Sequence, residues 1–469
     1  MLYHSTRGGG QPLGFDDVLL SGLARDGGLY LPETWPGLSA ETLRGFRGKP
    51  YAEVAAGVMR PFLEGSCAAG ALDDLCARAY RRFDRAGTCP LIQVDERRWL
   101  LELFHGPTLA FKDVALQLLG ELFEQVLAQR GEQITIVGAT SGDTGSAAIE
   151  ACRGRKNVDI FILHPKGRTS EVQRRQMTTV DAANVHNIAV AGTFDDCQAL
   201  VKAMFNDTAF RGEQGLSAVN SINFARILAQ TVYYVTAAVA LGAPDRAVDM
   251  AVPTGNFGNV FAGYAAKQMG VPIERLILGS NSNDILTRFC ETGEMDARGV
   301  VPTLSPSMDI QVSSNFERLL YDLLAHDGAA VARAMDRFKQ SGRFTVSEAQ
   351  LARFQRDFAG SRYDDNQTLG EMVRAHRETG LLLDPHTAIG LAAARDCNTA
   401  PERPTVALAT AHPAKFPEAV AKATGQRPAL PERLADLYDR PERMTELPAD
   451  LNTVMHHIRA NSRRTASAA

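Results

Sequence analysis

The sequence predicts an α/β protein with two parallel-sheet α/β domains, a mainly helical N-terminal domain and a helical insert. Three observations lead to this fold class. The chain has 469 residues, which is more than one ordinary hydrophobic core accommodates. Its composition, 45% hydrophobic and 22% charged, is that of a globular protein. From about residue 98, short apolar runs alternate with amphipathic stretches, which is typical of parallel strands covered by helices.

Residues 1–95 are rich in turns and then helical, which predicts the N-terminal domain. The strands predicted after it are residues 134–138, 158–163, 185–190, 248–253, 275–279 and 405–410. The helices predicted between them lie near residues 144–153, 170–178, 196–209, 223–241, 259–269 and 386–397. We expect one α/β domain over residues 96–235 and a larger one over 236–469. Charged helical segments at about 313–380 predict the insert.

Charge and composition argue against several kinds of partner. Fifty basic and 54 acidic side chains give a net charge of -4, so we expect no nucleic acid as the main partner. No run of about 18 apolar residues occurs, so we expect no membrane span. The seven cysteines never form C-x-x-C and the histidines never form H-x-x-x-H. This predicts a reducing cytoplasm, no disulfide framework and no bound metal.

Lys112 occupies an unusual place in the sequence. From Asp113 onward, apolar side chains repeat at helical spacing, and Gly131 is placed to end the helix. Because a helix start is electropositive, cations usually lie at the other end. Lys112 is therefore either an ordinary exposed lysine or an amine in a pocket that lowers its pKa. A lowered pKa is what a Schiff-base lysine requires.

Three strand-to-helix turns are candidate ligand sites, because ligands of open α/β sheets bind where strands end and helices begin. The first is "VGATSGDTGSAA" (137–148), whose backbone N–H groups and hydroxyls suit a carboxylate or a phosphate. Its candidate residues are Ser141, Gly142, Asp143 and Thr144. The alternative is that Ser141 or Asp143 simply caps the helix.

The second turn lies in "VPTGNFGNVFAGY" (252–264) and predicts a cup for a phosphate without a lysine in it. It is neither a Walker A loop nor G-x-G-x-x-G. The alternative is a turn whose glycines are needed for positive φ. Its candidate residues are Thr254, Gly255, Asn256, Phe257, Gly258 and Asn259.

The third turn, "NSINFARILAQ" (220–230), carries Asn220, Ser221 and Asn223 before Arg226. An arginine in the opening turns of a helix opposes the helix dipole, as Lys112 does, and its fork of donors suits a bound anion. The alternative is a surface arginine paired with a nearby acid. Two anion cups beside one lysine with a lowered pKa favour a phosphate-bearing aldehyde cofactor.

Six segments of the chain carry a family resemblance. They are "PTLAFKD", "SGDTGSAA", "NSINFARI", "PTGNFGN", "SPSMDIQVSSNFERLL" (305–320) and "ATAHPAKFPEA" (409–419). With "YHSTRG" and "DGGLYLP" near the start, they resemble the threonine synthase family of pyridoxal-phosphate enzymes, which is related to the tryptophan synthase β subunit. The resemblance covers nearly the whole chain. It implies that the cofactor lies in the cleft between the two α/β domains.

The resemblance implies a role for each turn. Lys112 would bind pyridoxal 5'-phosphate as a Schiff base, and the 254–259 loop would bind the cofactor phosphate through backbone amides. Thr410 would face the pyridine nitrogen with its hydroxyl. The turn from Ser141 to Thr144 would take the substrate's α-carboxylate. Many relatives have asparagine in place of Asp143, which would lie near the cofactor's 3-oxygen.

The resemblance also implies a substrate. Asn220, Ser221, Asn223 and Arg226 would hold the phosphate of O-phospho-L-homoserine. The reaction would eliminate that γ-phosphate, add water at Cβ and give L-threonine, with Lys112 removing the α-proton. Three other cations, Lys166, Arg168 and Lys415, are weaker candidates for binding this phosphate and are interpreted as surface charges.

Two other functions remain open at this point. A threonine synthase-like phospho-lyase shares most of these motifs and would give 2-oxobutyrate, ammonia and phosphate from the same substrate. A non-catalytic protein that binds pyridoxal phosphate is the second, although it would not need Lys112, Arg226 and Thr410 together. The sequence is compatible with a monomer or a homodimer.

Overall fold

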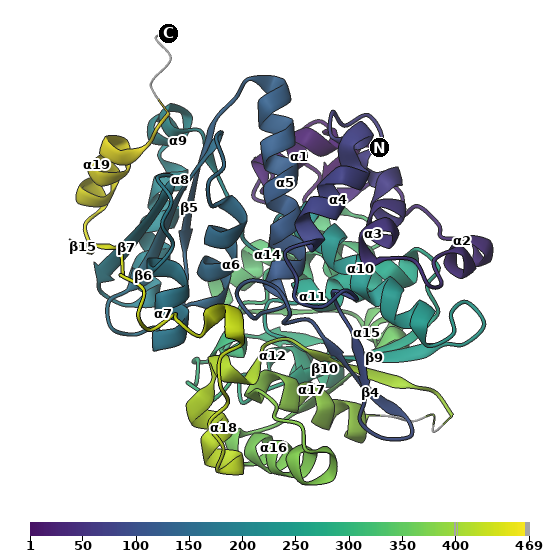
Figure 1. Ribbon diagram of the computed structural model, residues 1–469. Coiled ribbons are helices and arrows are strands. Elements are labelled where there is room, and N and C mark those ends of the chain that lie inside the picture. Colours follow the sequence, from purple (N-terminus) through teal and green to yellow (C-terminus); the bar gives the residue numbers. More distant parts are fainter. Residues whose placement is uncertain (398–399, 401, 465–469) are drawn as a thin grey trace.

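The computed structural model describes residues 1–397, 400 and 402–464. It contains two large β-sheets, each covered by helices, and the N-terminal helices pack beside them (Figure 1). The five-stranded sheet lies to the left of the long helix α5 (Lys112–Arg130) in that view, and the six-stranded sheet lies below it. In the described part of the chain, no helix is both long and apolar enough to cross a membrane.

The five-stranded sheet is parallel throughout, with the strand order β15-β7-β6-β5-β8. Its strands are β5 (Ile134–Ala139), β6 (Val158–Pro165), β7 (Val185–Ala191), β8 (Leu216–Ser217) and β15 (Thr445–Pro448). Every residue of β6 is buried, as expected for a strand covered on both faces. The covering helices are α6 (Asp143–Cys152), α7 (Glu171–Thr178), α8 (Phe194–Asn206), α9 (Thr208–Gln214) and α19 (Leu451–Asn461). The three strands predicted in this region are confirmed.

The six-stranded sheet has the order β13-β10-β9-β14-β4-β3, and every pair except β3–β4 is parallel. Its strands are β3 (Leu91–Gln93), β4 (Arg98–Glu102), β9 (Val248–Pro253), β10 (Ile273–Ser280), β13 (Phe358–Arg362) and β14 (Thr405–Ala409). The strands predicted at 248–253, 275–279 and 405–410 are confirmed. Helices near this sheet are α10 (Phe224–Ala240), α11 (Gly258–Gln268), α12 (Ile285–Thr292), α17 (Pro385–Asp396) and α18 (Pro417–Thr424).

Two strands pair with partners far away in the sequence. β4 precedes all strands of the five-stranded sheet but pairs with β14 in the other sheet. β15 follows all strands of the six-stranded sheet but pairs with β7. The division into residues 96–235 and 236–469 therefore stays a prediction. Under this division, β4 belongs to the first range but pairs in the sheet of the second, and β15 does the reverse.

The N-terminal region is mainly helical, with one small antiparallel pair of strands. Its elements are β1 (Tyr3–Ser5), α1 (Phe15–Ser21), β2 (Tyr30–Pro32), α2 (Ala40–Gly45), α3 (Tyr51–Met59), η1 (Arg60–Leu63), η2 (Ala69–Ala71) and α4 (Leu72–Tyr80). The rings of Tyr3 and Phe62 lie 5.3 and 6.3 Å from that of Phe224 on α10. This region therefore shares a hydrophobic core with the α/β part.

Residues 313–380 are mainly helical, as predicted, but they also contribute strands. The elements here and just before are β11 (Glu294–Asp296), η3 (Pro306–Met308), α13 (Phe316–Leu323), α14 (Gly328–Ser341), β12 (Arg343–Thr345), α15 (Glu348–Asp357) and α16 (Asp365–Thr379). β12 pairs with β11, and β13 forms one edge of the six-stranded sheet. The segment is therefore part of that sheet as well as a group of helices.

Candidate active site

Lys112 begins helix α5 beside the end of strand β14. Phe111, the residue before it, donates its backbone N–H to Thr410 O at 2.8 Å. Lys112 is only 9% exposed, and burial lowers the pKa of its amine, an effect that the negative charge of Asp143 partly offsets. Lys112 is therefore not an ordinary exposed lysine. Its surroundings favour the uncharged amine that Schiff-base chemistry requires.

Asp143, the first residue of α6, contacts two lysines with its two carboxylate oxygens. Oδ2 lies 3.3 Å from Lys112 Nζ and accepts a hydrogen bond from the Ser307 hydroxyl at 3.2 Å. Oδ1 lies 2.8 Å from Lys415 Nζ and also accepts from Gln173 Nε2 at 2.8 Å. Burial alone would raise the pKa of Asp143, but the charges of Lys415 and Lys112 outweigh it and hold that pKa well below its usual range. Asp143 is therefore ionised beside Lys112.

Lys415 is fully buried, so its interpretation as a surface charge is wrong. It lies in the short turn η4 (Pro413–Lys415), which follows β14. Its ammonium donates to Thr108 O at 2.7 Å and to Gln176 Oε1 at 3.0 Å, in addition to Asp143. These three acceptors occupy all three N–H bonds of the ammonium.

The other charged side chains of these segments have simpler positions. Lys166 and Arg168 are exposed, which confirms their interpretation as surface charges. Asp113 is buried and accepts from the Thr108 N–H at 2.8 Å and from the Thr108 hydroxyl at 2.7 Å. Asp113 therefore fixes the turn that precedes Lys112.

The turn before α6 keeps two hydroxyls near Asp143. Thr140 Oγ1 accepts two backbone N–H groups of this turn, at 3.0 and 2.9 Å, and Gly142 has a φ of 149°. Ser141 is exposed and Thr144 is half-buried. One of the N–H groups that Thr140 accepts belongs to Gly145 in the first turn of α6, so the side chain that caps the helix is Thr140, and the alternative that Ser141 or Asp143 caps it is wrong.

The loop 254–259 joins β9 to α11, and its glycines permit close packing rather than positive φ. A Cβ on Gly255 would lie 3.2 Å from the Met308 Cα. The residue with positive φ is Phe257, at 62°, and neither Gly255 nor Gly258 shares that conformation. The alternative of a turn whose glycines are needed for positive φ is therefore wrong.

Three buried donors near this loop have no hydrogen-bond partner among the described residues: Arg226 Nε, Asn259 Nδ2 and Asn315 Nδ2. The Asn259 amide is oriented by the hydroxyls of Tyr233 and Tyr234, which donate to its Oδ1 at 2.5 and 2.9 Å. The Asn315 amide lies against the loop, because a Cβ on Gly258 would be 3.2 Å from its Nδ2. An unpaired buried donor costs about 1–3 kcal/mol. The three donors are therefore suited to binding an anion.

Arg226 lies in the first turn of α10 and is 2% exposed. Its Nη1 donates to Val219 O at 2.9 Å, and within the described residues it has no ion pair with a carboxylate. Burial lowers the pKa of Arg226 to about 10. The alternative of a surface arginine paired with an acid is therefore wrong. A buried cation without a carboxylate partner among the described residues is suited to binding an anionic ligand.

The polar residues before Arg226 have different surroundings. Asn223 caps α10: its Oδ1 accepts a backbone N–H of the first turn at 3.1 Å, and its Nδ2 donates to Leu19 O at 2.9 Å. Asn220 is exposed and Ser221 is half-buried. Both polar atoms of the Asn223 side chain therefore form hydrogen bonds within the protein. The Asn220 amide and the Ser221 hydroxyl are better placed to bind a ligand.

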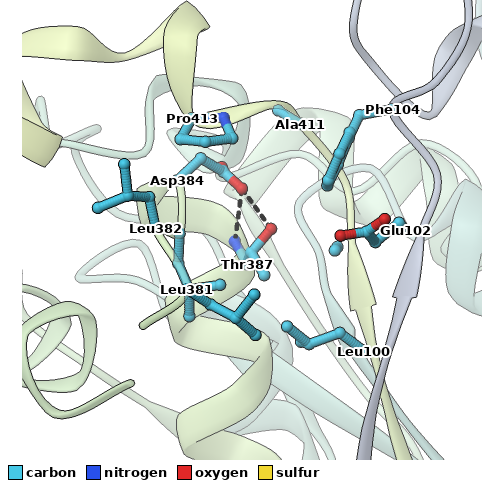
Figure 2. Close-up of a pocket in the computed structure, with 11 residues that line it drawn as sticks. Leu100, Glu102, Phe104, Leu381, Leu382, Asp384, Thr387, Ala411 and Pro413 are labelled. Carbon is cyan, nitrogen blue, oxygen red and sulfur yellow. Dashed lines mark hydrogen bonds between the residues drawn. The ribbon is translucent and has the colours of Figure 1, made fainter. Parts of the chain in front are cut away.

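Thr410 directly follows β14 and is held by a chain of hydrogen bonds. Its N–H donates to Thr387 Oγ1 at 3.2 Å, and Thr387 in turn donates to Asp384 (Figure 2). A cavity of about 20 Å³ lies beside this pair and is lined in part by Ala409 and Ala411. Because side chains alternate along an extended segment, Thr410 points away from that cavity. The cavity has room for about one water molecule.

Family models match almost the whole chain. "Threonine synthase N terminus" matches residues 2–80, "Pyridoxal-phosphate dependent enzyme" matches 89–411, and "Threonine synthase, C-terminal" matches 387–458. The threonine synthase of Pseudomonas aeruginosa is 54% identical over 465 residues, which are 99% of each chain. The chain belongs to the threonine synthase family. Threonine synthase-like 2 of Xenopus laevis, a relative with a different name, is 34% identical over 95% of each chain.

Solved threonine synthases share this fold. The PLP-bound threonine synthase of Brucella melitensis is 55% identical and superposes with a TM-score of 0.97, covering 99% of this chain and 100% of that one. The yeast threonine synthase is 39% identical, with a TM-score of 0.93 and 98% of each chain covered. The predicted fold class and the pyridoxal-phosphate cofactor are thereby confirmed.

The site of this threonine synthase family member includes residues that the sequence did not single out. Ser307 and Asn315 lie in the quoted segment "SPSMDIQVSSNFERLL", so the motif itself was the available signal. Lys415 was named from the sequence, but only as a weaker phosphate candidate interpreted as a surface charge, because its burial depends on partners more than 200 residues away. Within the described residues, no group of three or more His, Cys, Asp or Glu is placed to hold a metal ion.

Proposed function

We propose that this enzyme converts O-phospho-L-homoserine and water to L-threonine and phosphate. The observation that carries the proposal is Arg226, a buried guanidinium without a carboxylate partner among the described residues, close enough to Lys112 to affect its pKa. A pyridoxal-phosphate enzyme whose substrate lacks a phosphate would gain little from such a cation. O-Phosphohomoserine brings a second phosphate in addition to that of the cofactor.

The residues present fit the cofactor. Lys112 would bind its aldehyde carbon, and the loop 254–259, with the Asn259 and Asn315 amides, would bind its phosphate. Thr410 would face the pyridine nitrogen with a hydroxyl. When bound, the cofactor withdraws electrons from the substrate's Cα and so makes its proton acidic.

The chain's own side chains would bind the substrate and move protons. Ser141 and Thr144 would donate to the substrate's α-carboxylate, together with the start of helix α6. The uncharged amine of Lys112 would take the α-proton, and the ionised Asp143 beside it would stabilise the ammonium that results. Arg226 would hold the substrate phosphate with Asn220 and Ser221, while Asn223 shapes their turn by capping α10.

The phospho-lyase reaction is the second candidate, supported by the similarity to threonine synthase-like 2 proteins. The decisive experiment incubates the cofactor-loaded protein with O-phospho-L-homoserine and measures phosphate, threonine and 2-oxobutyrate separately. We expect one threonine for each phosphate released. Equal amounts of 2-oxobutyrate and phosphate would favour the phospho-lyase, and no phosphate release would contradict both reactions.

We also infer a reducing compartment such as the cytoplasm, because all seven cysteines are unpaired. Every residue assigned to the site comes from one chain, which is compatible with a monomer or a homodimer.

A further inference from the structure

Lys415 joins parts of the site that are far apart in the sequence. Its ammonium contacts Thr108 in the turn before α5, Gln176 on α7 and Asp143 on α6. Gln176 Nε2 also donates to Thr108 O, at 3.1 Å. One buried ammonium in the turn after β14 of the six-stranded sheet thus binds two helices of the five-stranded sheet and the turn that leads to Lys112.

The contacts of Lys415 leave no N–H bond for a ligand. Its side chain is 0% exposed, and its three donors have three acceptors within 3.0 Å. A substrate phosphate could bind Lys415 only by displacing one of these acceptors. Lys415 therefore acts on the reaction through other residues.

The turn that carries Lys415 is itself fixed. His412 Nδ1 accepts the Ala414 N–H at 3.1 Å, which requires the unprotonated imidazole. Burial lowers the pKa of His412 to about 4, so this hydrogen bond persists at neutral pH. The position of Lys415 is therefore fixed both by the backbone of its turn and by the hydrogen bonds of its ammonium.

We propose that Lys415 is a positioning residue that holds the ionised Asp143 through Oδ1, so that Oδ2 faces Lys112 Nζ and one carboxylate is shared between two lysines. The inference rests on the proposed role of Lys112 as the cofactor lysine. The charged groups that face Lys112 are Asp143 on α6, Lys415 in η4 and Arg226 on α10. Two cations against one anion leave a surplus of positive charge, which favours the uncharged amine of Lys112.

The test measures how fast the full-length protein, freed of cofactor, captures added pyridoxal phosphate at different pH values. Capture needs the uncharged amine, so its rate falls tenfold per pH unit below the pKa of that amine. In Lys415→Gln the whole charge of Asp143 acts on Lys112 and stabilises its ammonium. We expect the pH midpoint of capture to rise by about one unit and the rate at pH 7 to fall about tenfold.

Two further variants sharpen the test. Lys422→Gln removes an exposed lysine seven residues further along and should leave the midpoint unchanged. Asp143→Asn should move the midpoint in the opposite direction, down by about one unit, because Lys112 then faces only cations. An unchanged midpoint in Lys415→Gln overturns the inference. If Lys415→Gln does not fold by circular dichroism, Lys415→Met removes the same charge and takes its place: a raised midpoint supports the inference, and an unchanged midpoint overturns it.

Capture requires no substrate, so this result is independent of the reaction. A protein that shows both shifts but releases no phosphate from O-phospho-L-homoserine would support the positioning role and contradict the proposed function. The kinetic constants of a folded Lys415→Gln add a second readout. We expect kcat to fall about tenfold and KM to change less than about threefold, since Lys415 has no donor left for the substrate.

Discussion

Two groups of buried charged and polar side chains lie close together in this protein and are balanced in different ways. The lysine cluster, Lys112, Asp143 and Lys415, contains its own carboxylate. The arginine cluster, Arg226, Asn259 and Asn315, has donors without an acceptor among the described residues. The difference shows where the protein supplies a counter-charge itself and where a ligand has to bring one.

The difference follows from what each group has to do. The amine of Lys112 must exchange protons, so its charge has to be tuned by a permanent neighbour. A phosphate, by contrast, arrives with its charge and leaves with it, and a resident carboxylate beside Arg226 would compete with it. Four variants test this difference, and they follow in order of decreasing expected effect.

Replacing Lys112 should have the largest effect. Lys112→Ala removes the only covalent link to the cofactor that we propose, so we expect activity to fall by at least about 10⁴-fold and the absorbance band of the bound cofactor to disappear. Lys166→Ala, which changes an exposed lysine, is the matched control. A Lys112→Ala protein that keeps the band would contradict the role of this lysine.

Removing the charge of Asp143 should destabilise the protein. Asp143→Asn leaves the buried ammonium of Lys415 without its counter-charge, and breaking a buried ion pair on one side costs about 3–5 kcal/mol. Urea unfolding of the cofactor-free protein measures this loss directly. A loss below about 1 kcal/mol would mean that the lysine cluster is not balanced by its carboxylate.

Arg226→Met, unlike Asp143→Asn, should not destabilise the protein, but it should weaken substrate binding. Because Arg226 has no anionic partner among the described residues, its removal should leave the unfolding free energy of the cofactor-free protein unchanged or higher. We expect KM for O-phospho-L-homoserine to rise about 100-fold, a loss of about 2.7 kcal/mol. Arg211→Met, a change of an exposed arginine, is the control. An unchanged KM would remove Arg226 from the substrate phosphate.

The smallest effect concerns His412, which supports the lysine cluster through η4. Its pKa is lowered to about 4, so its contribution to stability is present above its unfolded pKa of about 6.5 and is lost as the pH falls towards 4. Between pH 7 and 5 the wild type should lose about 2 kcal/mol more than His412→Asn. Parallel urea titrations at pH 7 and 5 measure the difference. Equal losses in both proteins would show that His412 does not titrate in this way.

Much of the fold was predictable because the six strands carry continuous apolar runs, and the helix signals around Lys112 and Gly131 were correct. β13 was missed because "FAGSR" is short and lies among helices. The candidate turns were found from glycines and hydroxyls next to strands. The burial of Lys415 could not be predicted, because Thr108, one of its acceptors, lies 307 residues away in the sequence.

The sheet order also determines when the site can exist during synthesis. Strands β5, β6 and β7 are contiguous in sequence and can pair soon after they leave the ribosome. The six-stranded sheet needs β14 between β9 and β4, and β14 emerges last of these strands. Thr410 and Lys415 follow β14 directly, so Lys112 has to wait for some 300 more residues before its pocket closes. A chain released before β14 would contain Lys112, Asp143 and Arg226 but lack Thr410 and Lys415.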